Sequence, residues 1–103
     1  MTKYGLHGHL LAKAGSVDQL LEILLQAADL VAGSKGCHLY VVSKDPQAVN
    51  QVWITEIWDS KEAHDESLQN PAVRALIGQA MPLLDGPPSP GQTLEVYGGH
   101  GIS

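Results

Sequence analysis

The stretch that decides the fold is Cys37-His-Leu-Tyr-Val-Val-Ser43, followed after a short loop by Gln51-Val-Trp-Ile-Thr-Glu-Ile-Trp58. Both segments are rich in β-branched and aromatic residues, which favour strands. Lys44-Asp45-Pro46, which lies between them, is a turn signal. Because the connection is short, we expect the two strands to pair as an antiparallel hairpin.

A strand and a long helix are predicted before this hairpin. Lys3–Lys13 alternates two sets of side chains with period two, which is typical of a strand. Ser16 and Gln19 have the spacing of a capping box, in which two side chains satisfy free donors at a helix start. An apolar stripe at helical spacing follows from Val17, and Gly33 is expected to end the helix.

Two capping signals follow the hairpin. Asp59 and Glu62 form a second possible capping box, which predicts a short helix that ends near Leu68. Asn70-Pro71 places a capping residue before a proline that suits the first helical position. This signal predicts a third helix with an apolar face that extends to Leu84.

The C-terminal part of the chain is predicted to be a loop and a last strand. Pro82 removes a hydrogen bond near the end of the third helix and is expected to bend it. Asp85–Gly91 contains three prolines and two glycines and is expected to form a loop. Gln92–Tyr97 is the predicted final strand.

The order of elements, β-α-β-β-α(α)-β, predicts a single α+β domain over residues 1–103 with a ferredoxin-like fold. We expect a four-stranded antiparallel sheet with helices on one face. The other face carries large apolar side chains, and burial of one such side chain stabilises a protein by about 1.5–3 kcal/mol. We therefore expect this face to stack on the same face of a second copy, as a homodimer that encloses a pocket.

The charge pattern and the cysteine count exclude several classes. The net charge is −5, and the six basic residues are scattered singly, so neither nucleic acid nor an anionic membrane surface is expected as a partner. No apolar run is long enough for a membrane helix. One cysteine permits no internal disulfide and no thiolate zinc site within a chain. The N-terminal segment lacks the apolar core of a signal peptide, and we expect a cytoplasmic setting.

Motifs along most of the chain resemble one known family. Gly36-Cys37-x-x-Tyr40-x-Val42, then Asp45-Pro46, then Glu56-x-Trp58-x-Ser60-x-x-Ala63 are similar to the antibiotic biosynthesis monooxygenases, which include quinol monooxygenases. The resemblance implies a dimeric α/β barrel. The sequence departs from the family at two positions: many members carry histidine where this chain has Ser67, and some where it has Ala72. This chain has His64 instead, nearer the start of the helix.

The resemblance implies a function that needs no bound cofactor. We expect oxidation of a small quinol, polyphenol or polyketide-like aromatic by molecular oxygen, with oxygen as co-substrate and neither metal nor flavin. A site of this kind holds the substrate, removes its proton and excludes water. Two alternatives stay open on the same fold. One is an isomerase of a small carbonyl compound that works by proton transfer, and the other is a pocket that binds a hydrophobic metabolite without catalysis.

Four residues are predicted to bind the substrate. Glu56 and Trp58 share one strand face, and the resemblance directs Trp58 at the pocket, where it would stack on a planar ring. The alternative is that Trp58 fills the dimer core and Glu56 pairs with a lysine or a backbone donor. Ile54 and Tyr40 are the other two residues predicted to contact the substrate. The alternative for Tyr40 is a packing role.

Three histidines are the candidate catalytic bases. His7 and His9 are two residues apart on a strand and point the same way, so both enter the pocket if their face is the uncovered one. Neutral imidazole takes a phenol proton near pH 7. The two are also half of a metal site, but without a third ligand we predict no metal. His64 is the third candidate, in place of the displaced helical histidine. The alternative for all three is a polar residue that borders solvent.

Overall fold

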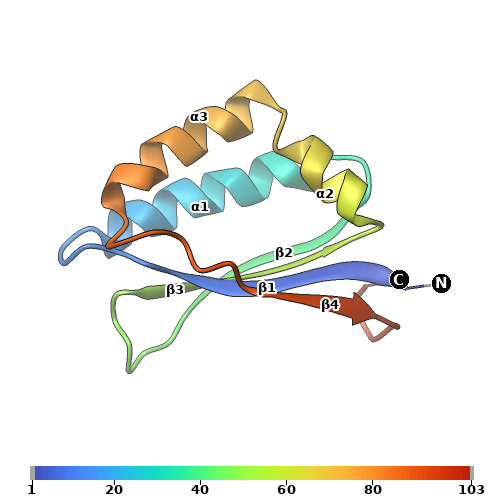
Figure 1. The fold of residues 1–103 in the computed structure, drawn as a ribbon, viewed down its shortest axis with the longest axis horizontal. Coiled ribbons are helices and arrows are strands. Elements are labelled where there is room, and N and C mark those ends of the chain that lie inside the picture. The colour runs from blue at the N-terminus through green and yellow to red at the C-terminus, as the bar shows by residue number, and fades with distance from the viewer. Residues whose placement is uncertain (1, 103) are drawn as a thin grey trace.

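The computed structural model describes residues 2–102. Figure 1 shows the chain in the predicted order of elements. The strands are β1 (Lys3–Leu11), β2 (Cys37–Lys44), β3 (Gln51–Trp58) and β4 (Gln92–Val96), and the helical elements are α1 (Val17–Ala32), α2 (Lys61–Ser67), α3 (Pro71–Ala80) and a 3-10 turn, η1 (Met81–Leu83).

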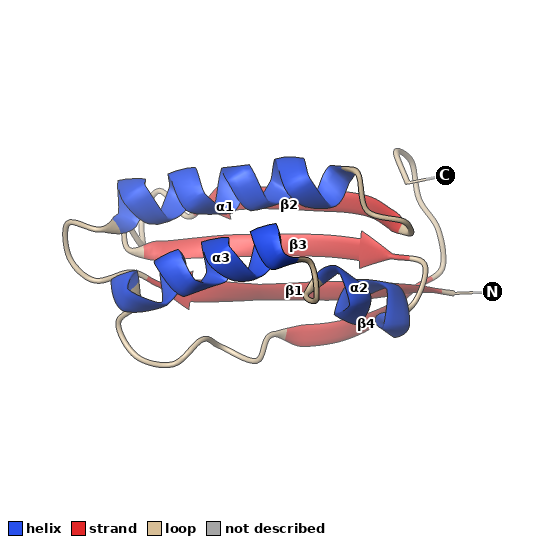
Figure 2. Ribbon diagram, turned by 90° about the horizontal axis from the view of Figure 1, so that it is seen from above, coloured by secondary structure: helices blue, strands red, loops and turns tan. Residues whose placement is uncertain are grey.

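The four strands form one antiparallel sheet in the order β2-β3-β1-β4. The predicted hairpin of β2 and β3 is confirmed, with Tyr40 opposite Glu56. All three helices lie on one side of the sheet, and the other side is uncovered (Figures 1 and 2). The ferredoxin-like α+β fold is therefore confirmed.

Strand periodicity divides the central strands between the two faces. The residues of β1 and β3 that face the helices pair across the strands as Tyr4 with Trp58, Leu6 with Glu56, Gly8 with Ile54 and Leu10 with Val52. The intervening residues, including His7, His9 and Trp53, point to the uncovered face. The helix layer thus covers the face that carries Glu56.

Two groups of buried side chains join the helices to the sheet. The larger group contains Leu20, Leu24 and Val52 and connects α1 and α3 to the ends of β1 and β3. The smaller group consists of Val31, Trp58 and Val73 at the opposite end of the sheet. Large apolar side chains bring these layers together because their burial removes hydrocarbon from water.

The helix starts agree only partly with the capping signals. Asn70 caps α3 as expected, since its side chain accepts a hydrogen bond from the Ala72 amide. The predicted Asp59 cap of α2 is wrong: Ser60 is the cap, and its hydroxyl accepts from the Ala63 amide. The predicted capping box at Ser16 is also wrong, because Ser16 has helical backbone angles and makes no side-chain cap bond.

Proline and glycine define two connections. Pro82 lies in η1 after α3 has ended at Ala80, so it ends the helix instead of bending it. Gly36 has φ +87° before β2, and a Cβ there would lie 2.9 Å from the Ala63 Cβ. Only glycine fits this close approach between the turn and α2 without strain. Over residues 2–102, no helix is both long enough and apolar enough to cross a membrane.

Candidate functional site

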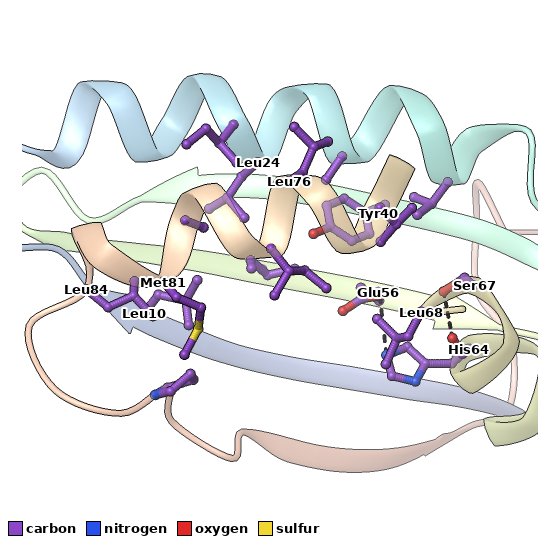
Figure 3. A pocket seen from close by; sticks show the side chains of 18 residues that line it. Leu10, Leu24, Tyr40, Glu56, His64, Ser67, Leu68, Leu76, Met81 and Leu84 are labelled. Atoms are coloured by element: carbon purple, nitrogen blue, oxygen red, sulfur yellow. Dashed lines mark hydrogen bonds and ion pairs between the residues drawn. The ribbon is translucent and has the colours of Figure 1, made fainter. Parts of the chain in front are cut away.

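A partly open cavity lies between the sheet and the helices (Figure 3). It measures about 210 Å³. Its walls are contributed by β1, β2 and β3 on one side and by α1, α2 and α3 on the other. A cavity of about 150 Å³ in another protein holds benzene, so this one is large enough for a substituted aromatic ring.

Polar side chains gather at one end of the cavity. Figure 3 shows Tyr40, Glu56, His64 and Ser67 at this end, and Leu10, Met81 and Leu84 at the other. Tyr40 and Glu56 come from directly opposite positions of β2 and β3, whereas His64 and Ser67 come from α2. The rest of the lining is apolar.

Glu56 is a buried carboxyl that is held from two sides. The Trp58 indole Nε1 donates a hydrogen bond of 3.0 Å to Glu56 Oε1, and His64 Nε2 lies 3.9 Å from the same oxygen. Burial raises the pKa of Glu56 above its usual value, while the Trp58 bond and the charge of His64 lower it. The protonation of Glu56 therefore depends on Trp58 and His64.

The imidazole of His64 is oriented by its neighbours. Its Nδ1 lies 3.0 Å from Asp65 Oδ1, and its ring centroid lies 5.6 Å from that of Tyr4. The Trp58 ring is nearly perpendicular to it, at a centroid distance of 5.8 Å. Hydrogen bonds from Lys61 and then from His64 hold the pKa of Asp65 below its usual range. When Asp65 accepts a hydrogen bond from Nδ1–H, Nε2 is left as the basic nitrogen on the side of Glu56.

Two hydroxyl groups complete the polar end. Burial raises the pKa of the Tyr40 phenol, and the charge of Glu56 raises it further, so Tyr40 stays a neutral donor. Tyr40 lines the cavity, so a ligand there would lie beside it. Ser67 donates to the His64 carbonyl oxygen at 2.6 Å and so fixes the last turn of α2.

The polar end suits proton transfer. It provides a carboxyl, an imidazole and a neutral phenol around one apolar space, and an acid, a base and a donor are the groups that such chemistry requires. Among residues 2–102, no three histidine, cysteine or acidic side chains come close enough together to hold a metal ion.

Comparison with known proteins identifies the family. The family model described as antibiotic biosynthesis monooxygenase matches residues 4–79, which is most of the chain. The protein belongs to the antibiotic biosynthesis monooxygenase family. The matched range includes every strand and helix that carries a polar residue of the cavity. A search of curated proteins finds no match.

Solved structures agree with this assignment. A candidate antibiotic biosynthesis monooxygenase from Chloroflexus aurantiacus J-10-fl is 39% identical, with a TM-score of 0.88 over 98% of this chain and 99% of the other. A candidate member from Caulobacter crescentus CB15 is 17% identical, with a TM-score of 0.86 over 94% and 92%. A Nitrosomonas europaea protein of unknown function is 23% identical, with a TM-score of 0.78 over 96% and 93%. The last two show the fold alone.

Four of the predicted site residues line the cavity of this family member. Tyr40, Ile54, Glu56 and His64 all contribute to its walls. Trp58 does not, because its side chain is fully buried with Val31 and Val73. The expected stacking of Trp58 on a ligand is therefore wrong for this cavity, and its contact with Glu56 is the role that the structure shows.

His7 and His9 lie on the opposite, uncovered face. They flank Trp53 at centroid distances of 5.0 and 4.8 Å, and His7 Nδ1 is 2.9 Å from Thr55 Oγ1. They line a shallower hollow of the uncovered face and not the cavity under the helices, because period two shows which residues share a face but not which face the helices cover. The expected pocket between the uncovered faces of two copies stays a prediction. Any role of His7 and His9 in proton transfer stays a prediction.

Several lining residues were not predicted. Leu24, Leu76 and Leu84 belong to apolar stripes that predict a packed core, and all three line the cavity. Ser67 replaces a family histidine and was not singled out. Apolar residues repeat at helical spacing whether their side chains pack against a neighbour or line a cavity. The sequence therefore does not distinguish core residues from cavity residues.

Proposed function

We propose that this family member is a cofactor-independent monooxygenase that oxidises a small, electron-rich quinol or polyphenol with molecular oxygen. The observation that carries the proposal is the Glu56–His64 pair at the polar end of an otherwise apolar cavity. Membership of the antibiotic biosynthesis monooxygenase family supports the general reaction class.

The proposed reaction begins with removal of a phenolic proton by His64 Nε2, supported by Glu56. The resulting anion transfers one electron to oxygen, and recombination of the radical pair forms a peroxide at a ring carbon that bears hydrogen. The peroxide then loses water and leaves a carbonyl. One atom of oxygen enters the substrate, and the other leaves as water with the two hydrogens that the substrate has lost.

The cavity walls and Tyr40 support this sequence in two ways. The apolar lining excludes water while the peroxide exists, which prevents side reactions. The neutral Tyr40 hydroxyl can donate to an oxygen of the substrate, which fixes the ring next to His64. Neither contribution requires a bound cofactor.

The test is oxygen consumption by chelator-treated protein with a panel of hydroquinones and polyhydroxylated aromatics. His64→Ala is expected to lower kcat by about 100-fold or more, since a positioned base contributes about 10²–10⁴-fold. His7→Ala and His9→Ala are the matched histidine variants on the other face. If they lose activity and His64→Ala does not, the assignment of the base to His64 is wrong.

The same assay distinguishes the two other functions. Turnover that continues in oxygen-free solution would indicate an isomerase that uses the same carboxyl and imidazole. Stabilisation by the aromatic without any product would indicate a binding protein. Oxygen uptake that is proportional to the protein and insensitive to chelator supports the monooxygenase.

We also infer that the uncovered sheet face pairs with a second copy of the chain. The His7–Trp53–His9 cluster lies on this face, and Leu11 and Val41 are exposed beside it. Exposed apolar and aromatic side chains that gather on one sheet face are typical of an interface. Because the cavity lies between the sheet and the helices, on the other side of the sheet from this face, we expect each copy of the dimer to carry its own site.

A further inference from the structure

We propose that the ligand of this cavity is a neutral amphiphile, a hydroxylated ring with an apolar tail, and that aromatic acids are rejected. The ring would lie at the polar end, beside Glu56 and His64, and the tail would run toward Met81. That this ligand is oxidised rests on the proposed function, whereas its binding in the cavity does not.

The length of the cavity supports a tail. Glu56 lies opposite Leu6 on β1, and Leu10 lines the far end. Leu10 is four residues along the strand from Leu6, which is about 13 Å at roughly 3.3 Å per residue. Figure 3 shows the polar group and the Leu10–Met81–Leu84 group at the two ends of this space. A single ring held at Glu56 leaves the apolar end empty.

The charges of the lining support a neutral ligand. None of the residues that line the cavity is a lysine or an arginine, and Glu56 is its one acidic residue. His64 is the one lining residue that can be cationic, and it already faces the Glu56 carboxyl at 3.9 Å. A carboxylate on the ligand would therefore leave water only to share that cation with Glu56 or to meet a hydrocarbon wall. Neutral hydroxyl groups can instead bind His64 and Tyr40.

The mouth of the cavity extends the apolar surface. Ile77 and Met81 line the cavity, yet their side chains remain 42% and 49% exposed. They are four residues apart along α3 and η1, so they lie on one side of the helix. A tail that extends out of the cavity would cover the exposed side chains of Ile77 and Met81. Because this contact removes hydrocarbon from water, we expect ligands with longer chains to bind more tightly.

The experiment measures binding without turnover. Oxygen-free calorimetric titration with para-methylphenol, para-butylphenol and para-hexylphenol gives the dependence on chain length. A para-hydroxyphenyl alkanoate with the same chain as the butyl compound gives the dependence on charge. We expect affinity to rise by up to about fourfold for each added CH₂ and to fall at least tenfold for the carboxylate. Equal affinities along the series, or equal affinity for the acid, would overturn the proposal.

A pair of variants locates the tail. Met81→Lys is expected to flatten the dependence on chain length and to improve binding of the carboxylate, because it replaces hydrocarbon at the mouth by a cation. Leu25→Lys is the matched control: Leu25 is 54% exposed on α1 and does not line the cavity. The proposal is wrong if both variants alter the chain-length series equally.

The outcome is separable from that of the proposed function. A chain-length preference without any oxygen uptake would leave the binding inference intact and end the monooxygenase proposal. Oxygen uptake that does not depend on the chain length or charge of the substrate would support the monooxygenase proposal and end the binding inference.

Discussion

At the scale of single residues, the site depends on a carboxyl that folding has removed from water. Glu56 is buried, yet its Oε1 accepts from Trp58 and lies near His64. Burial alone would favour the protonated form, and the two neighbours favour the charged form. Since these effects oppose each other, small changes around Glu56 decide which form is present.

Trp58→Phe tests the role of the indole. The substitution removes the N–H that stabilises the Glu56 carboxylate, so the pKa of Glu56 is expected to rise further. Carbon NMR of the labelled Glu56 carboxyl during a pH titration measures this change directly. Near-ultraviolet circular dichroism controls for loss of packing around the buried ring. A titration of Glu56 that is unchanged in a folded variant would show that the hydrogen bond has no effect on its protonation.

Glu56→Gln is expected to change how stability depends on pH. Because the folded pKa of Glu56 is raised, the folded protein holds this proton more tightly than the unfolded chain does. The stability that this proton gives the folded protein is complete below the pKa of Glu56 in the unfolded chain, about 4.3. It is lost as pH rises through the pKa of Glu56 in the folded protein. The free energy of unfolding of the wild type should therefore fall relative to Glu56→Gln over this window.

Urea denaturation across a pH series measures the difference. Glu22→Gln, which removes an exposed carboxylate from α1, accounts for the loss of one negative charge. If the free energy of unfolding of the wild type instead rises with pH relative to that of Glu56→Gln, the pKa of Glu56 is not raised in the folded protein.

At the scale of elements, a short helix positions the imidazole. α2 has seven residues, which is too short to be stable alone. Ser60 accepts a bond from the Ala63 amide at its start, and Ser67 closes its end by donating to the His64 carbonyl oxygen. These two hydroxyl groups hold the turn that carries His64.

Ser60→Ala is expected to lower the free energy of unfolding by about 1 kcal/mol, the usual contribution of a capping side chain. Ser16→Ala is the matched control at the start of α1, where no side-chain cap bond is made, and it should change stability much less. Equal losses in the two variants, measured by urea denaturation, would contradict this account of the caps.

Sequence signals predicted elements better than they predicted ends. The hairpin and the apolar stripe of α1 follow from periodicity, and Asn70-Pro71 marked the start of α3 correctly. The cap of α2 was placed one residue early because Asp59 and Ser60 both suit the position. Asp59 is instead paired with His38, a contact between distant segments that no local pattern records.

At the scale of the whole molecule, the two faces of the sheet have different roles. The covered face builds a cavity within one chain, and the uncovered face presents apolar side chains to solvent. We expect that second face to hold the dimer together without contributing to the cavity walls.

Val41→Lys tests the interface. Val41 is 43% exposed on the uncovered face, so a lysine there leaves the core intact but cannot be buried against a second copy without cost. The variant is expected to sediment as a monomer, and Leu25→Lys on α1 is expected to remain dimeric. The prediction fails if both variants show the same mass at equal concentration.

The sequence by itself determined the order of elements, the ferredoxin-like sheet, the family and the sets of side chains that share a strand face. It also identified Tyr40, Ile54, Glu56 and His64, because local motifs and residue types are enough to mark them. Only the tertiary structure decided which face the helices cover. That choice placed Glu56 in the cavity and moved His7 and His9 outside it. The physical reason is that local periodicity repeats equally on both faces of a strand, whereas burial depends on packing between segments that are distant in the chain.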